Sequence, residues 1–441
     1  MKSTHWITTL CVIATASLLT ACGGQGASPG AVDKDMEKSN NGPVELTVYS
    51  AGGEPEESWN ANFGNAIKKK FPNYKINYIN PRGNANLKID ALLTSGTTVD
   101  IYYESIGGFF SSMSTYQLQY DLTDLIKKYK VDLNRFEPSL IDAMKNNVKG
   151  QIWGLPVQNI NMVLYYNKDV FDKFGIAYPK DGMTWDEALT LAKKFNRTEG
   201  GKQYTGLVVS PAHMIKMNPY SLPLVDPASE QATINKDAKW KALYQTLFAD
   251  VASDETYRAK IASLNNKLPY IDQFYKNYDL AMFAGLSSLF TSFAEFESLN
   301  WDIVSLPTFK DLPKTGSQSY PTYFSVTSSS KYKEEAFQVI NYLTSDEVQL
   351  DISKKGLMSS LKGEQFKSNY AKDAKFKNKN FQALFYNQLA PIPAKTVYDT
   401  IAEKAYQKQL VDLSLGKVDI NTMFRAAEEE TNKGIASQKG K

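Results

Sequence analysis

Short apolar runs alternate with segments of helical period in the first part of the chain. Residues 45–49, 75–79 and 99–103 combine β-branched and aromatic side chains over the length of one strand. Between them, residues 59–71 and 87–93 place apolar side chains three and four positions apart, which is the spacing of an α-helix face. This strand–helix–strand–helix–strand order predicts an α/β fold, in which a parallel sheet carries helices on its faces.

The rest of the chain mixes strands and helices in the same way. Thr184-Trp185-Asp186-Glu187 has the pattern of a capping box, in which a threonine and a glutamate close the first turn of a helix. Further strands are predicted at 151–156, 162–166, 207–209, 280–283, 301–306 and 323–326, and further helices at 184–195, 238–248, 333–343, 345–356, 397–416 and 420–430. The length of 441 residues suggests two or three domains, and no internal repeat is visible.

The first residues predict export from the cell. Lys2 precedes an apolar run at 7–19, which is shorter than the roughly 20 residues of a membrane-spanning helix and is typical of a signal peptide. Leu19-Thr20-Ala21-Cys22 follows, and this pattern resembles the lipobox of bacterial lipoproteins. The resemblance implies a signal peptide at 1–21, a lipid (diacylglycerol, with palmitate-type chains) on Cys22, and anchorage at the extracytoplasmic face of the cell membrane. An ordinary signal peptide that happens to contain a cysteine is the alternative.

Composition narrows the chemistry that the chain can carry. Residues 22–43 are rich in glycine, serine, asparagine and charge, and predict a flexible tether. Cys11 lies inside the predicted signal, so the mature chain would keep one cysteine and form no disulfide. Lysine and arginine number 50 against 47 aspartates and glutamates, and this near balance argues against nucleic acid as a partner.

Candidate catalytic and metal-binding residues are scarce. His5 falls in the predicted signal, and His213 lies in a loop-like stretch that favours a structural role. Histidine is the commonest general base and metal ligand, so no catalytic residue, metal site or cofactor is predicted. The 26 tyrosines and 22 phenylalanines instead suit an amphipathic binding surface.

Three segments, taken together, carry a resemblance to a known family. The first runs from Ile152-Trp153-Gly154-Leu155-Pro156 to Leu164-Tyr165-Tyr166-Asn167-Lys168-Asp169, with the helix start at Thr184 after it. The second is Leu280-Ala281-Met282-Phe283-Ala284-Gly285, and the third extends from Leu306-Pro307-Thr308-Phe309-Lys310 through Ser345-Asp346-Glu347 to Gly356. In order and spacing the chain resembles the bacterial extracellular solute-binding proteins for sugars, the group that includes the maltose-binding protein.

The resemblance implies a fold and a mode of action. The fold would be the two-lobed α/β fold of type II periplasmic binding proteins, with an interdomain cleft and crossing hinge strands. Residues 44–156 and 307–343 would form lobe 1, and residues 157–306 and 344–441 would form lobe 2. A carbohydrate, with an oligosaccharide favoured, would be held by hinge closure and passed unchanged to the permease subunits of an ABC importer. The protein would act as a monomer.

Two departures from the family pattern put the identity of the ligand in doubt. Many members carry a tryptophan two residues after the glycine that matches Gly285, where this chain has Ser287. Many also carry paired glycines where this chain has Tyr320-Pro321-Thr322-Tyr323. Both positions lie near the ligand cleft of the family, so no single relative predicts the ligand.

Candidate ligand-binding residues lie after strands and at the crossings. A sugar needs flat apolar surfaces for its C–H faces, and donors and acceptors for its hydroxyls. The candidates are Glu54, Tyr103, Glu104, Trp153, Gln158, Asn159, Asn161, Phe283, Tyr320 and Tyr323. Structural roles compete for several of them: Trp153 also suits hinge packing, Glu54 suits the N-terminal turn of a helix, and only one of Tyr102 and Tyr103 can face the cleft.

Other functions stay open on the sequence alone. The same fold binds non-sugar solutes such as peptides or polyamines, and Arg82 would suit a charged clamp for a peptide or an amino acid. A secreted glycoside hydrolase would need two carboxylates about 5–10 Å apart, and no such pair is marked out among the acidic residues. A lipoprotein that only senses or adheres is a further alternative.

Overall fold

The computed structural model describes residues 43–440. The predicted signal peptide, Cys22 and nearly all of the predicted tether therefore lie outside the described residues. None of the helices within residues 43–440 is long and apolar enough to cross a membrane.

The first of two larger sheets follows the predicted βαβαβ pattern. It comprises β1 (Val44–Ser50), β2 (Tyr74–Ile79), β3 (Ile101–Ser105), β4 (Leu155–Asn159), β11 (Thr322–Val326) and β12 (Met358–Ser359), in the order β12-β4-β11-β3-β1-β2. β1 pairs in parallel with both β2 and β3, as predicted, whereas β11 runs antiparallel to β3 and β4. The carboxyl ends of β1, β2 and β3 consequently meet at one edge of this sheet.

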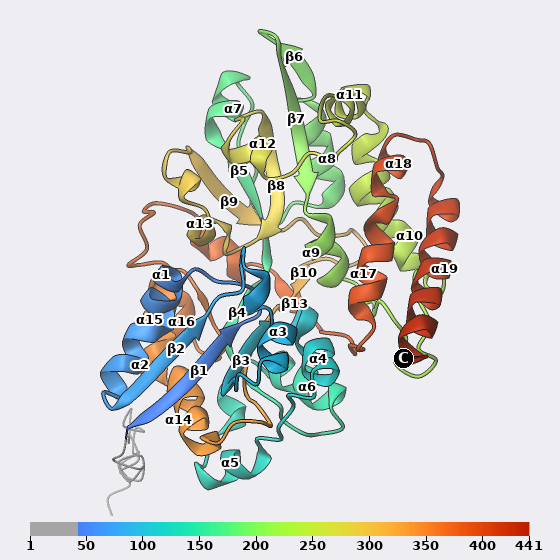
Figure 1. Cartoon of the computed structure of the whole chain (residues 1–441). Helices are drawn as coiled ribbons and strands as arrows, with labels where there is room; N and C mark the ends of the chain where they lie inside the picture. Colours follow the sequence, from blue (N-terminus) through green and yellow to red (C-terminus); the bar gives the residue numbers. More distant parts are fainter. Residues whose placement is uncertain (1–42, 441) are drawn as a thin grey trace, which may run out of the picture. The chain divides into compact units, whose positions relative to one another are not determined.

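Helices cover the first sheet and form the first lobe with it. Figure 1 shows α2, α14 and α15 to one side of this sheet and α4 and α6 to the other. The helices of this lobe are α1 (Glu56–Trp59), α2 (Asn65–Lys70), α3 (Ile89–Thr94), α4 (Ile106–Thr115), α5 (Thr123–Lys128), α6 (Pro138–Asn147), α14 (Lys333–Leu343), α15 (Asp346–Lys354) and α16 (Glu364–Ser368). A π-helical turn, Asn60–Gly64, joins α1 to α2, so the single helix predicted at 59–71 contains one wide turn.

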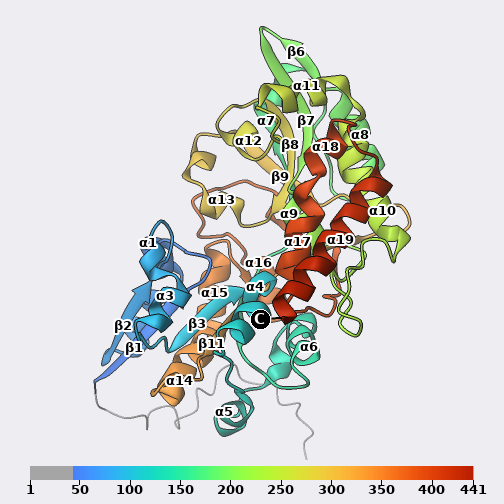
Figure 2. The ribbon, with the colours of Figure 1, turned by 45° about the vertical axis from the view of Figure 1, so that its right-hand side comes forward.

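The second sheet is the centre of the second lobe. It comprises β5 (Met162–Asn167), β6 (Arg197–Glu199), β7 (Lys202–Val209), β8 (Leu280–Leu286) and β9 (Trp301–Ser305), in the order β6-β7-β8-β5-β9. Its helices are α7 (Lys168–Lys173), α8 (Trp185–Lys193), α9 (Pro211–Lys216), α10 (Ala238–Tyr244), α11 (Glu255–Ser263), α12 (Asp272–Tyr275) and α13 (Leu289–Ser292). The C-terminal helices α17 (Asp399–Lys408), α18 (Leu410–Ser414) and α19 (Ile420–Lys439) follow, and Figure 2 shows α17 and α19 side by side.

The chain crosses between the two sheets several times. It passes from β4 to β5 through two residues, and it returns from β9 to β11 through β10 (Thr315–Gln318), which pairs with the later strand β13 (Gln388–Ala390). It crosses again after β12, because the 3-10 turn Phe381–Phe385 packs against β9. These segments are the crossings that connect the two lobes.

Two predicted boundaries differ from the structure. The strand expected at 151–156 starts later, at Leu155, because the ladder with β11 begins there. Gly154 precedes it and passes so close to β11 that an added Cβ would lie 2.9 Å from the Phe324 carbonyl oxygen. The predicted division also placed all residues from 344 onward in lobe 2, but β12 pairs with β4, so the segment Met358–Ser359 belongs to the first sheet.

The capping box predicted at Thr184 is present and supports a testable stability effect. Thr184 Oγ1 accepts a hydrogen bond from the Glu187 amide, and Glu187 Oε2 accepts one from the Thr184 amide at 2.8 Å. A lost side-chain cap costs about 1 kcal/mol. We therefore expect Thr184→Ala to lower the free energy of unfolding by about 1 kcal/mol, as measured by urea denaturation, and Thr190→Ala, on the same helix but past its first turn, to cost less.

Candidate functional site

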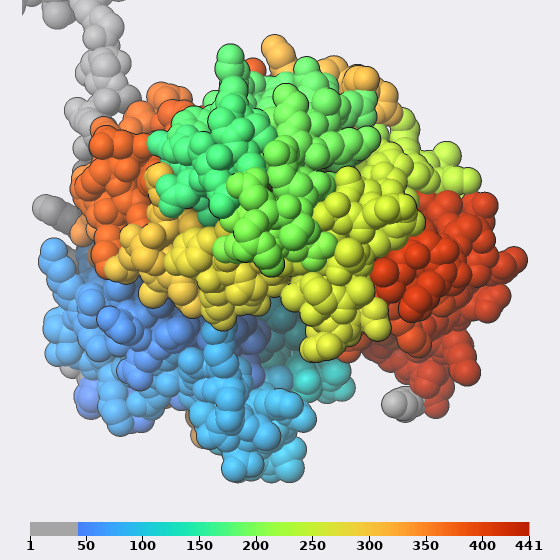
Figure 3. All heavy atoms as spheres, turned by 90° about the horizontal axis from the view of Figure 1, so that it is seen from above, coloured from blue at the N-terminus to red at the C-terminus, as the bar shows by residue number. Residues whose placement is uncertain are grey.

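A cavity of about 470 Å³ lies between the two lobes. The first lobe contributes side chains that include Glu54, Tyr103, Glu104 and Gln158, and the second lobe contributes Ser288, Thr291 and Ser292. We call this space the interlobe cavity. Figure 3 shows the segment around α13 lying directly against the segment around α1 on this side of the molecule.

The topology of the first sheet explains why these side chains converge. Ser50 ends β1, Tyr103 and Glu104 are near the end of β3, and Arg82 follows β2. Parallel strands bring their carboxyl ends to one edge of a sheet, which is where α/β sheets bind ligands. The turn after β8, which ends at Leu286, contributes Ser288 to the cavity from the second lobe.

Glu54 is held in place by the side chains around it. The Tyr103 hydroxyl donates to Glu54 Oε2 at 2.9 Å, and Asn62 Nδ2 donates to Oε1 at 3.0 Å. Tyr78 donates to the Glu54 carbonyl oxygen at 2.6 Å, and its hydroxyl also lies 3.0 Å from that of Tyr103. Burial raises the pKa of the Glu54 carboxyl, while the bonds from Tyr103 and Asn62 oppose that rise.

Aromatic rings fix Tyr103 from behind. Its ring is stacked on Phe324 with centroids 4.3 Å apart, and on Trp59 with centroids 5.5 Å apart. Trp59 is also stacked on Tyr78 at 4.8 Å. Since Tyr103 is only 5% exposed, its hydroxyl reaches the cavity while its ring faces are taken up by the core. The expectation that this ring offers a flat surface to a ligand is therefore not met.

Glu104 presents a carboxylate with spare acceptor capacity. The Tyr102 hydroxyl donates to Oε2 at 2.7 Å. The side chain lies over Gly108, where an added Cβ would be 1.9 Å from Oε1, so a larger residue at position 108 would displace the carboxylate. Burial raises the pKa of Glu104, against the opposing effects of Tyr102, Ser112 and the positive charge of Lys216.

The raised pKa of Glu104 predicts how stability depends on pH. The folded chain holds this proton to higher pH than the unfolded chain, so ionisation costs stability as the pH rises from the ordinary value of 4.5 through the raised pKa. Below this window the carboxyl is protonated in both states and costs nothing. We expect Glu104→Gln, which cannot ionise, to gain stability relative to the wild type across this window and to keep the gain at neutral pH.

Urea denaturation of both proteins from about pH 4 to pH 8 measures this difference. Glu56→Gln, on the exposed side of α1, is the control and should show no such gain. A stability difference that does not change with pH would contradict the raised pKa.

The charges around the interlobe cavity are balanced. Two acidic residues, Glu54 and Glu104, and two basic residues, Arg82 and Lys355, line it. Arg82 Nη2 donates to the Gly52 carbonyl oxygen at 3.4 Å, and Lys355 Nζ donates to Asp351 Oδ2 at 2.6 Å and to the Ala61 carbonyl oxygen at 2.8 Å. Both cations are thus bound to groups of the first lobe, and the cavity carries no excess of one sign.

Three candidates from the first crossing lie away from the interlobe cavity. Asn159, next to Gln158, lines a second cavity, and its Oδ1 accepts from the amides of Ile160 and Tyr320. Asn161 is buried, and its Nδ2 donates to the Leu384 carbonyl oxygen at 2.8 Å. The half-buried Trp153 donates from Nε1 to Gln151 Oε1. These side chains make hydrogen bonds within or next to the first crossing and do not line the interlobe cavity.

The aromatic candidates are mostly core residues. Phe283 is 1% exposed and packs edge-on against Tyr270. Tyr323 is fully buried, and its hydroxyl donates to the Leu140 carbonyl oxygen at 2.6 Å. Tyr320 lies one contact away from the cavity, because its hydroxyl accepts from Ser105, which lines it. Strand alternation decides this outcome: neighbours on a strand point to opposite faces, and the pattern alone did not tell which face is buried.

Several residues of the interlobe cavity were not predicted. Ser288, Thr291 and Ser292 follow β8, where the sequence offered only the departure at Ser287 as a signal. Asn62 lies in the π-helical turn, whose wide geometry the helical pattern did not indicate. Lys355 comes from the end of α15, far along the chain, and no local feature of the sequence marked it.

Among the described residues, metal-binding groups are not gathered here, although the carboxyl groups of Glu54 and Glu104 line the same cavity. Within residues 43–440, no cluster of three or more His, Cys, Asp and Glu side chains could hold a metal ion. His213 Nδ1 and Ser210 Oγ are 2.8 Å apart and share a hydrogen bond, and burial lowers the pKa of the His213 imidazole to about 4. The imidazole is therefore neutral at pH 7 and serves in a local hydrogen bond.

Comparisons with known proteins agree with this architecture. The chain is 30% identical over 161 residues to an uncharacterised ABC transporter extracellular-binding protein of Pyrococcus horikoshii, a match covering 34% of each chain. It is 28% identical over 171 residues to the arabinooligosaccharide-binding protein of Bacillus subtilis, covering 37% of this chain and 38% of the relative. The matches thus span little more than a third of these relatives.

The solved structures extend the likeness in fold to nearly the whole chain. An ABC substrate-binding protein from Listeria monocytogenes, in complex with cycloalternan, superposes with a TM-score of 0.73 over 89% of this chain and 99% of its own. Its sequence identity is 21%, so the likeness concerns the fold. The predicted two-lobed α/β fold of type II binding proteins is thereby confirmed.

A family model gives the assignment for the sequence itself. It matches residues 52–350, a stretch that includes β2 to β11, so both larger sheets apart from β1 and β12, and most of the interlobe cavity. This match covers more than half of the chain. The chain belongs to the family of bacterial extracellular solute-binding proteins.

Proposed function

We propose that the protein binds a neutral carbohydrate, most favourably an oligosaccharide, in the interlobe cavity and delivers it to an ABC importer. The observation that carries this proposal is the chemistry of the cavity. Hydroxyl, amide and carboxylate side chains converge there from both lobes, with charges of opposite sign in balance. Sugar hydroxyls both donate and accept hydrogen bonds, and this mixture of groups satisfies both demands.

The position of the cavity supports a binding step without chemistry. Its walls belong to two lobes joined by crossing segments, so a ligand that touches both walls favours the arrangement in which they are close. Glu54 is fixed by Tyr103 and Asn62, which keeps its acceptors in place before the ligand arrives. Such preorganisation reduces the entropy lost on binding. The Bacillus subtilis relative binds arabino-oligosaccharides by its name, and the Listeria structure contains cycloalternan, which favours an oligosaccharide here as well.

The proposal includes a membrane location. Cys22 would carry the lipid after removal of residues 1–21, and residues 22–43 would tether the binding unit to the extracytoplasmic face. Metabolic labelling with a palmitate analogue tests this part. We expect label on the wild-type chain and none on Cys22→Ala; equal labelling of both would contradict the anchor.

Calorimetric titration with a panel of solutes tests the ligand class. The panel comprises neutral mono- and oligosaccharides, glycerol 3-phosphate, a polyamine and a short peptide, and chromatography then checks the ligand for cleavage. We expect an oligosaccharide to bind and to be recovered intact. Binding of glycerol 3-phosphate or the peptide without any sugar would select the alternative in which Arg82 and Lys355 clamp an anionic group. Binding of the polyamine alone would also exclude a neutral sugar, and new reducing ends would indicate a hydrolase.

A further inference from the structure

A second cavity of about 430 Å³ lies apart from the interlobe cavity. Its walls come from the start of α6, from β4, from the segment that includes β12 and α16, and from the chain after the 3-10 turn Phe381–Phe385. Its volume falls in the range of small-molecule pockets, about 300–1,000 Å³. Nothing in the proposed carbohydrate function uses this space.

The β4–β12 ladder separates the two cavities. Gln158 lines the interlobe cavity, and its neighbour Asn159 lines the second one. Likewise, Leu357 lines the interlobe cavity, and its neighbour Met358 lines the second cavity. Met358 pairs with Asn159 in the ladder, and adjacent strand residues point to opposite faces. The cavities therefore lie on opposite faces of one partition and can be occupied independently.

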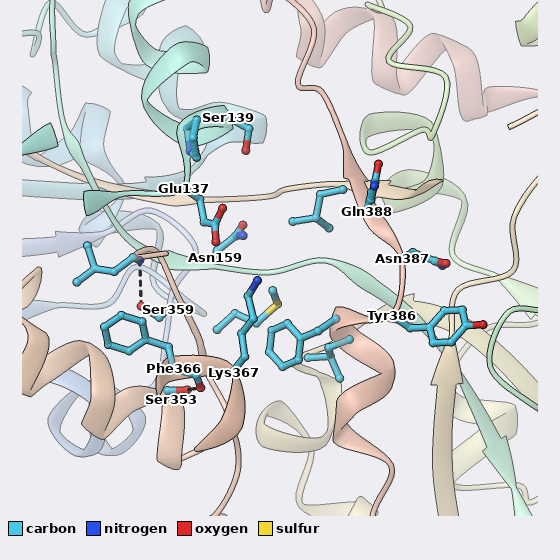
Figure 4. A pocket seen from close by; sticks show the side chains of 16 residues that line it. Glu137, Ser139, Asn159, Ser353, Ser359, Phe366, Lys367, Tyr386, Asn387 and Gln388 are labelled. Carbon is cyan, nitrogen blue, oxygen red and sulfur yellow. Dashed lines mark hydrogen bonds between the residues drawn. The ribbon is translucent and has the colours of Figure 1, made fainter. Parts of the chain in front are cut away.

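Two opposite charges without partners face each other in the second cavity. Figure 4 shows the carboxylate of Glu137 and the amine of Lys367 reaching into the same space from opposite sides. Both side chains are half-buried. Among residues 43–440 neither group has a hydrogen-bond or ion-pair partner, although fourteen ion pairs form elsewhere in this part of the chain. A ligand with a positive and a negative end pairs with both groups at once, so this arrangement suits a zwitterion.

Apolar side chains form one part of the wall beside the two charges, next to polar ones such as Asn159 and Ser359. Phe366 and Met358 are buried, and Leu361, Leu384 and Phe385 complete this surface. Asn387 also lines the cavity, but its Nδ2 donates to the Leu306 carbonyl oxygen at 2.7 Å, which directs its amide away from the two charges. A ligand that fits must combine a positive end, a negative end and an apolar body in a small volume.

We propose that the second cavity binds a free amino acid with an apolar side chain. The ammonium group would pair with Glu137 and the carboxylate with Lys367, while the side chain would pack against Phe366, Met358 and Leu384. Glu137 is the N-cap residue of α6 and makes no side-chain cap bond, so its carboxylate is available to the ammonium group. The proposal does not depend on the identity of the solute in the interlobe cavity.

Calorimetric titration of the full chain with L-phenylalanine and L-leucine tests the proposal. We expect both to bind, and we expect Glu137→Gln and Lys367→Met each to weaken binding about tenfold or more, because each removes a charge-assisted bond. 3-Phenylpropionate, which lacks the ammonium group, should show the same loss on the wild-type chain. Glu364→Gln and Lys362→Met, exposed neighbours that do not line the cavity, are matched controls and should leave the affinity unchanged.

Two results would overturn the proposal. The first is the absence of binding by both amino acids to a wild-type chain whose thermal unfolding is cooperative. The second is binding that survives Glu137→Gln and Lys367→Met but is lost in Glu104→Ala, since the amino acid would then occupy the interlobe cavity. That second result would also contradict the proposed carbohydrate ligand, whereas the first would leave it untouched.

Discussion

Replacing Glu104 with alanine is expected to weaken carbohydrate binding by roughly ten- to a hundredfold. The carboxylate uses Oε2 to accept from Tyr102 and keeps acceptor capacity toward the interlobe cavity. Hydrogen bonds to charged groups contribute about 1.5–3 kcal/mol, which corresponds to this range of affinity. Titration calorimetry with the oligosaccharide that binds the wild type best measures the loss directly.

The control for this prediction is Glu56→Ala. Glu56 is an exposed glutamate in the first turn of α1 and does not line the cavity, so the variant removes the same charge from the same neighbourhood. We expect its affinity to match that of the wild type. Equal affinities for Glu104→Ala and the wild type, with both chains folded, would exclude Glu104 from ligand binding.

Replacing Trp59 with alanine is expected to lower the free energy of unfolding by about 3–5 kcal/mol, the usual cost of removing a large buried aromatic side chain. Trp59 is 2% exposed and is stacked on Tyr78, Tyr103 and Phe324. Its loss leaves a hole behind Tyr103, whose hydroxyl fixes Glu54. We therefore expect weaker ligand binding in addition to lower stability, both measured on the same preparation by urea denaturation and calorimetry.

Trp153→Ala is the control that shows whether the loss of stability in Trp59→Ala comes from the burial of Trp59 or from the loss of any tryptophan. Trp153 is half-buried, and its indole donates to Gln151 rather than to a core group. Its removal should cost less than half as much stability as the removal of Trp59. Equal losses at the two positions would show that the ring stack around Tyr103 contributes nothing beyond the general effect of deleting a tryptophan.

The spacing of apolar residues predicted the order of the main strands and helices, because that spacing depends only on residues near one another in the sequence. The order of β1, α2, β2, α3 and β3 followed from apolar spacing alone. Helices α4 and α6 were not predicted, since Ile106–Thr115 contains two glycines and four serines and threonines, and Pro138–Asn147 has few long apolar side chains. These helices form because β3 and β4 provide apolar surfaces to pack against, and tertiary packing of this kind overrides weak local propensity.

The sequence predicted those residues of the candidate site that lie at or just after the end of a strand. Glu54, Tyr103 and Glu104 follow or end parallel strands, and they line the interlobe cavity as that position implies. Lys355 and Thr291 come from segments whose approach depends on how the lobes are joined, which no local pattern encodes. Tyr323 has the right composition for a binding residue, but its hydroxyl is satisfied by Leu140 inside the core.

A crystal structure of the full chain with its tightest oligosaccharide would test the central claim most directly. The account predicts the sugar in the interlobe cavity, with hydroxyls within hydrogen-bond distance of Glu104 and with contacts to Ser288 or Thr291 from the second lobe. A sugar bound at any other surface, with the interlobe cavity left to solvent, would contradict it.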